Sequence, residues 1–156
     1  MSQHGVVGIG NAFRGDDAVG LAVAERLRGR VPPGVEVVPC ELEPSRLIEA
    51  WEGAESALVV DAVDSGAEPG TLWRFDASEE AVPARAFRSS THALGVGDAI
   101  ELARALGRLP RRVVVYGVEG VEFAAGEGLT PPVEAAVERT ACAVLVDLEQ
   151  IAREEE

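Results

Sequence analysis

The chain has 156 residues, of which 47% are hydrophobic and 26% charged, and this composition is typical of one globular domain spanning residues 1–156. Its 27 acidic and 14 basic residues give a net charge of −13, which repels nucleic acid and anionic lipid, so neither nucleic acid nor a membrane is expected as a partner. No apolar run reaches the ~18 residues of a membrane span, and MSQHGVVGIG lacks the features of a signal peptide. We therefore expect a cytoplasmic protein, while its oligomeric state stays open.

Apolar runs alternate with helical patterns along the chain. Period-2 or continuous apolar runs predict strands over residues 5–9, 35–40, 56–63, 71–75 and 112–116. Helical periodicity predicts helices over residues 17–28, 45–51, 97–106 and 131–153. Thr130 is the expected N-cap of the last helix, because Pro131 follows at the first helical position. The strand at 71–75 is expected at a sheet edge, and residues 77–92 are expected to form a long loop.

This alternation predicts an α/β fold. We expect a three-layer sandwich in which a mostly parallel, twisted sheet of about five strands carries helices on both faces. Right-handed crossovers place the carboxyl ends of parallel strands at one edge, where open α/β sheets bind ligands. The segments that meet there are GNAFRGDD after the first strand, DAVDSGAEPG after the third and VEG after the last.

Acidic side chains in these segments, together with one histidine, are the candidate functional residues. Asp16 is predicted to be a helix N-cap, and Asp17 is either a first-turn acid that favours the helix dipole or a ligand. Asp61 ends an apolar strand, where an unpaired carboxylate costs several kcal/mol, so it needs a backbone donor, a cation or a metal. His92, in the polar loop, and Glu119, after the last strand, are either surface residues or members of the same edge.

The remaining chemically distinctive residues have structural interpretations. The cysteines form no CxxC pair. Cys142 lies in the apolar stretch ACAVLV and is predicted to be a core residue, and Cys40 is interpreted as a packing residue, with metal ligation as the alternative. His4 and the terminal residues 154–156 are expected in poorly ordered ends of the chain.

Two carboxylates and one imidazole at one sheet edge form an O/O/N ligand set for a divalent metal ion, which makes Asp17, Asp61 and His92 the candidate site. In this interpretation the short glycine turn delivers Asp17 to the edge. A dinucleotide site is a poor match, because GIGNAF lacks the third glycine and the adjacent aspartates would repel a pyrophosphate. A P-loop, a G-x-S-x-G elbow and an H-E-x-x-H helix are absent from the sequence.

Four blocks resemble the hydrogenase maturation proteases, the endopeptidases that trim the C-terminal extension of nickel–iron hydrogenase large subunits. The blocks, which occur in family order, are GIGNAFRGDDAVG (8–20), LVVDAVDSGAEPG (58–70), STHALGVGDAI (90–100) and VYGVEGVEF followed by GEGLTPPV (115–133). The resemblance implies a twisted central sheet in an α/β sandwich. It also implies metal contacts from an acid in the Gly-Asn loop, an aspartate ending a later strand and a histidine after the long loop, which fall on Asp17, Asp61 and His92.

The resemblance further implies the reaction, the partner and the cofactor. The expected enzyme is a peptidase acting on a hydrogenase large-subunit precursor, with nickel supplied by that substrate rather than held by the free enzyme. Whether the metal, a metal-bound water or an aspartate drives hydrolysis stays open. The family has Glu or Asp at the position of Asp17. Gly120 departs from the family, because a proline is expected after Glu119, and residues 76–90 match nothing specific, which leaves the particular hydrogenase unassigned.

Three other functions are considered. A metal-dependent hydrolase or phosphotransferase for small molecules would act on a generic ester or phosphate with added Mg²⁺. A non-enzymatic nickel-binding accessory protein would bind the hydrogenase subunit without shortening it. A relative of peptidyl-tRNA hydrolase would share the Gly-x-Gly-Asn strand end, but the charge of −13 and the missing Pro-Gly after Asn11 count against it.

Overall fold

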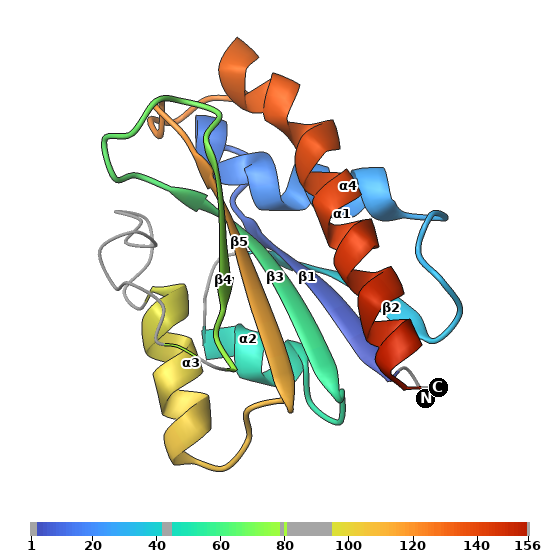
Figure 1. Cartoon of the computed structure of the whole chain (residues 1–156). Helices are drawn as coiled ribbons and strands as arrows, with labels where there is room; N and C mark the ends of the chain where they lie inside the picture. Colours follow the sequence, from blue (N-terminus) through green and yellow to red (C-terminus); the bar gives the residue numbers. More distant parts are fainter. Residues whose placement is uncertain (1–2, 42–44, 79, 81–94, 156) are drawn as a thin grey trace.

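The computed structural model describes residues 3–41, 45–78, 80 and 95–155. In this part of the chain, one five-stranded sheet has the order β2-β1-β3-β5-β4 (Figure 1). The strands are β1 (His4–Gly10), β2 (Val35–Glu41), β3 (Ser56–Val63), β4 (Leu72–Asp76) and β5 (Arg112–Glu119). All neighbouring pairs are parallel except β4 with β5, so the sheet is mixed and mostly parallel, with β4 at the expected edge. Strands β1 and β3 are buried throughout, as their continuous apolar runs predict.

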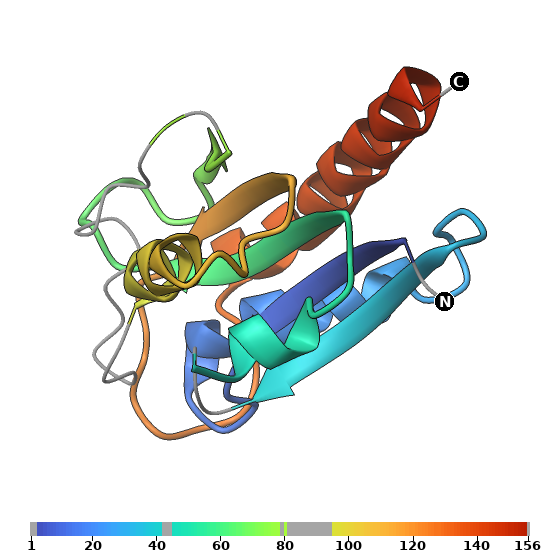
Figure 2. The same cartoon turned by 90° about the horizontal axis from the view of Figure 1, so that it is seen from below.

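Helices cover both faces of this sheet (Figure 2). The helical elements are the 3₁₀ turn η1 (Gly15–Ala18) and the helices α1 (Val19–Leu27), α2 (Ser45–Ala50), α3 (Val96–Ala105) and α4 (Pro131–Glu154). Side chains of α1 and α4 share one apolar core with one face of the sheet. Side chains of α2 and α3 share a second core with the opposite face. The predicted three-layer α/β sandwich is therefore confirmed.

Helix α1 approaches the sheet at two glycines. A Cβ atom at Gly8 in β1 would lie 2.2 Å from the carbonyl oxygen of Gly20 in α1. A Cβ atom at Gly20 would lie 2.1 Å from the carbonyl oxygen of Ile9 and 2.5 Å from that of Val60. These distances are shorter than any real Cβ contact, so only glycine permits this packing. The glycines thereby fix α1, and η1 before it, over the junction of β1 and β3.

Both ends of the described chain are ordered, contrary to the expectation from sequence. His4 is only 7% exposed in β1, and its Nε2 lies 3.0 Å from Oε1 of Glu155. Glu154 forms an ion pair with Arg112 at the start of β5. The last turn of α4 is thus attached to the amino ends of the strands, because this 24-residue helix runs the length of the sheet. Residue 156 lies outside the described residues.

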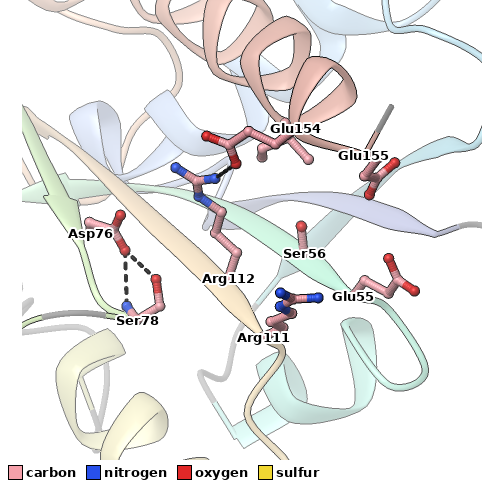
Figure 3. Close-up of a pocket in the computed structure, with 9 residues that line it drawn as sticks. Glu55, Ser56, Asp76, Ser78, Arg111, Arg112, Glu154 and Glu155 are labelled. Atoms are coloured by element: carbon pink, nitrogen blue, oxygen red, sulfur yellow. Dashed lines mark hydrogen bonds and ion pairs between the residues drawn. The ribbon is translucent and has the colours of Figure 1, made fainter.

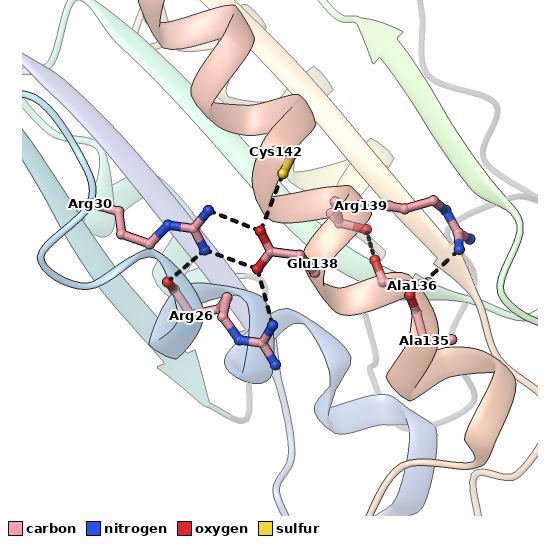
Figure 4. Close-up of polar contacts among 8 residues, drawn as sticks. Arg26, Arg30, Ala135, Ala136, Glu138, Arg139 and Cys142 are labelled. Carbon is pink, nitrogen blue, oxygen red and sulfur yellow. Dashed lines mark hydrogen bonds and ion pairs between the residues drawn. The ribbon is translucent and has the colours of Figure 1, made fainter.

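The two cysteines differ in environment. Cys40 is buried in the core beneath α2 and α3, and burial raises the pKa of its thiol. The prediction for Cys142 is wrong, because its side chain is exposed. It lies on the polar face of α4, where its Sγ is 3.2 Å from the Glu138 carboxylate, which also binds Arg26 and Arg30 of the α1 region (Figure 4). Composition alone placed Cys142 in the core, whereas the 3.6-residue period turns it outward.

A hollow of about 490 Å³ opens at the amino ends of β3 and β5 (Figure 3). Its walls include Glu55, Ser56, Arg111 and Arg112. This edge is opposite the strand ends that are expected to carry the site, so the hollow is separate from it. Among the described helices, none is long and apolar enough to cross a membrane.

Candidate active site

The order of strands reverses between β1 and β3, since β2 lies on one side of β1 and the later strands lie on the other. This is the position at which open α/β sheets bind ligands, just beyond the carboxyl ends of the strands. Asp17 arrives there from η1 and Asp61 from β3. A Cβ atom at Gly10 would lie 2.2 Å from the carbonyl oxygen of Asp17, so η1 rests directly on the end of β1.

Asp61 is a buried carboxyl group with an incomplete set of hydrogen bonds. Its residue is 1% exposed, and its Oδ1 accepts a hydrogen bond of 2.8 Å from the backbone N–H of Ala62. Its Oδ2 is buried and has no hydrogen-bond partner among the residues that the structure describes. A buried polar atom without a partner is costly, which makes Asp61 a candidate functional residue. Side chains alternate along β3, and Val59 and Val63 pack on the α2–α3 face, so Asp61 points toward that face.

The charge of Asp17 affects the pKa of Asp61. Burial, and then the negative charge of Asp17, raise the pKa of Asp61 well above its ordinary value, while the Ala62 N–H opposes this shift. Asp17 is itself fully buried. The structure therefore brings together two of the three residues predicted from the sequence, as an acid pair at low dielectric. Such a pair favours a proton or a cation in its surroundings.

The third predicted residue, His92, lies outside the described residues. Within the described ranges, no group of three His, Cys, Asp or Glu side chains is arranged to hold a metal ion.

Asp16 is not the helix N-cap that the sequence predicted. Neither η1 nor α1 has a side-chain cap, and Asp16 instead reaches across to the loop after β5. Its fully buried carboxylate accepts hydrogen bonds from the backbone N–H groups of Val121 (2.9 Å), Glu122 (3.1 Å) and Thr130 (2.8 Å), and from the Thr130 hydroxyl. Burial raises the pKa of Asp16, but these bonds outweigh burial and lower it. Asp16 therefore fixes the turn that carries Asp17.

Glu119 is neither a solvated loop charge nor a third partner of the acid pair. It is fully buried, and its carboxylate accepts hydrogen bonds from the backbone N–H and hydroxyl of Ser65 and, at 3.4 Å, from the Trp73 indole. It thus holds the loop that follows Asp61 and β3. Sequence reasoning gave no hint of this role beyond the position of an acid at a strand end.

Gly120, which stands where the family pattern has a proline, lies in a tightly packed position. A Cβ atom at Gly120 would lie 2.8 Å from Cβ of Asp16 and 2.8 Å from Cζ of Phe123. A side chain at this position would push Asp16 and the ring of Phe123 apart. The departure from the family pattern is therefore matched by close local packing.

Comparison with known proteins agrees with this architecture. Residues 21–147 match the sequence model of the family described as hydrogenase maturation protease. The hydrogenase expression/formation protein HupD of Bradyrhizobium diazoefficiens is 32% identical over 148 residues, which cover 91% of this chain and 77% of that protein. The hydrogenase 2 maturation protease of Escherichia coli is 30% identical over 149 residues, which cover 93% of this chain and 90% of that protein.

The solved structure of the hydrogenase maturating endopeptidase HybD from E. coli is similar to this chain, with a TM-score of 0.81 and 29% identity over 95% of this chain and 93% of that one. The family resemblance inferred from the sequence is thus confirmed. The relatives are peptidases, which favours a peptidase over the other functions considered from the sequence. The chain belongs to the hydrogenase maturation protease family of endopeptidases.

Proposed function

We propose that this endopeptidase removes the C-terminal extension of a nickel-loaded hydrogenase large-subunit precursor, and that Asp17, Asp61 and His92 contact the nickel of the substrate. The observation that supports this proposal is the buried Oδ2 of Asp61, which has no partner in the described part of the chain and lies near a second buried acid. A divalent cation satisfies such a pair, because it offsets the repulsion between the two carboxylates and supplies the missing partner. Oxygen and imidazole ligands suit borderline Ni²⁺.

The same chemistry supports a metal that arrives with the substrate. The proposed set has two carboxylates and one imidazole without a thiolate, whereas tight protein sites for nickel or zinc usually add thiolates or further histidines. The free enzyme is therefore expected to bind metal weakly. Binding of the precursor then depends on its nickel, and an empty precursor gains little from this site.

The acid pair also has a place in the hydrolysis. Nickel, when present, would polarise the scissile carbonyl. A carboxylate at hydrogen-bonding distance from a water accepts its proton as the water oxygen attacks the carbonyl carbon, and then passes that proton to the leaving amine nitrogen. Asp17 or Asp61 would supply this carboxylate, since both are buried acids at the carboxyl ends of the strands. We place this reaction in the cytoplasm, as the sequence led us to expect.

Substitutions at Asp17 test the proposed contact. Asp17→Ala is expected to lower the cleavage rate of nickel-loaded precursor by at least 10²-fold, because the acid pair is lost. Asp17→Glu is expected to retain part of the activity, since it restores the carboxylate one methylene farther from the backbone. Mass spectrometry of the precursor before and after incubation measures cleavage, and the melting temperature of each variant controls for folding. Undiminished cleavage by a folded Asp17→Ala variant would remove Asp17 from the site.

A further inference from the structure

Two exposed apolar side chains lie on the loops that build the candidate site, and we propose that they contact an apolar stretch of the substrate polypeptide beside the scissile bond. These residues are Phe13, which is 65% exposed, and Val121, which is 59% exposed, and together we call them the apolar rim. The inference rests on the proposed function, because it assigns the surface that positions the substrate of that reaction.

The loops that carry the apolar rim are joined by backbone hydrogen bonds. The N–H of Gly126 donates to the carbonyl of Phe13 (2.8 Å), and the N–H of Gly15 donates to the carbonyl of Gly126 (2.9 Å). The N–H of Asp16 donates to the carbonyl of Glu122 (2.8 Å). Residues 13–16 and 122–126 therefore form one paired platform, rather than two independent loops.

Each rim residue is also held at its own backbone. The N–H of Phe13 donates to Oδ1 of Asn11 (2.9 Å), and the N–H of Val121 donates to Oδ2 of Asp16 (2.9 Å). The backbone of both residues is thus fixed while their side chains remain in water. Holding an apolar group in place before binding lowers the entropy that association loses, and this is the arrangement expected of a contact surface.

The position of the apolar rim identifies its occupant. Phe13 precedes Asp17 by four residues in the connection from β1, and Val121 is bound by the carboxylate of the residue next to Asp17. The turn that carries Asp17 is bonded through Asp16 to the loop that carries Val121, so a polypeptide bound at Asp17 would be adjacent to these loops. An apolar segment of that polypeptide is the partner that gains from burying Phe and Val side chains.

The described residues supply matched controls. Their other exposed large hydrophobic side chains are Leu102 in α3, Leu106 just after it and Val146 in α4, none of which lies on the paired loops. Single exposed apolar residues of this kind are normal on protein surfaces. A comparison of rim and helix positions therefore separates a contact with substrate from a general effect of surface hydrophobicity.

Steady-state cleavage of nickel-loaded precursor tests the inference. Phe13→Ser and Val121→Ser are each expected to raise KM by about 10-fold, the effect of losing one partly buried apolar contact, with kcat changed by less than about twofold. Phe13→Leu is expected to keep KM within about threefold of wild type, because leucine retains apolar area. Leu102→Ser and Val146→Ser are expected to leave KM and kcat unchanged.

Two results overturn the inference: a wild-type KM in the folded double variant Phe13→Ser/Val121→Ser, or an equal rise in KM for the helix controls. Failure of the proposed function would give another result, because wild-type enzyme would then cleave empty and nickel-loaded precursor at the same rate. Because the rim side chains are exposed, the melting temperatures of the serine variants are expected to match wild type, and this separates a lost contact from a damaged fold.

Discussion

Replacing Asp61 with asparagine is expected to abolish cleavage and, at neutral pH, to make the protein more stable. Asparagine has nearly the same shape, and its side-chain oxygen can still accept the hydrogen bond from the Ala62 N–H. The substitution removes an acid that is buried beside Asp17 and whose Oδ2 has no partner within residues 3–41, 45–78, 80 and 95–155. Relief of such a functional strain commonly stabilises a protein by about 1 kcal/mol. Loss of the acid is expected to lower the cleavage rate by at least 10²-fold.

The pH dependence of stability provides an independent check on Asp61. Its folded-state pKa lies above the unfolded value of about 3.9, so in the interval between them the folded state binds more protons than the unfolded state. Wild-type stability therefore falls as pH rises through this interval, and the Asp61→Asn variant lacks that fall. Urea unfolding from about pH 4 to about pH 8 measures the difference. A variant that is less stable than wild type at neutral pH contradicts the assignment.

Asp16→Ala is expected to cost about 3 kcal/mol of unfolding free energy, because three backbone N–H groups and one hydroxyl lose their acceptor in a buried place. An N-cap would contribute only about 0.5–2 kcal/mol. Cleavage is also expected to slow, since the turn that carries Asp17 is no longer attached to the loop after β5. Urea unfolding gives the stability change directly.

Asp16 is expected to change the pH dependence of stability in the direction opposite to Asp61. Its hydrogen bonds lower the folded-state pKa, so its contribution to stability is complete above the unfolded value of about 3.9 and is lost as pH falls through the folded value. The difference between wild type and Asp16→Ala is therefore expected to shrink in acid. A difference below about 1 kcal/mol at neutral pH would show that the carboxylate does not hold the loop.

The fold was predictable because its signals are local. The apolar runs at 5–9 and 56–63 indicate strands buried on both faces, and the spacing of apolar residues in α1 and α4 indicates which helices cover them. The buried position of Asp61 was also predictable, since this residue lies near the end of a continuous apolar strand, while its role in the site stays a prediction.

What the sequence could not supply are contacts between distant segments. The hydrogen-bond partners of Asp16 lie more than 100 residues later in the chain, so a local pattern could indicate only a helix cap. The pairing of His4 with Glu155 joins the two ends in the same way. The buried role of Glu119 depends on the loop after β3, and the outward position of Cys142 depends on the helical phase of α4.

The central claim is that the enzyme recognises the nickel bound to its substrate and does not hold a metal ion of its own. The most direct test incubates purified enzyme, with its metal content measured, with empty and nickel-loaded large-subunit precursor and follows the loss of mass. Because the proposed ligands are two carboxylates and one imidazole, the enzyme is expected to contain no stoichiometric nickel or zinc and to shorten only the loaded precursor. One tightly held metal per chain, together with equal cleavage of both precursors, would contradict the account and indicate a conventional metalloprotease.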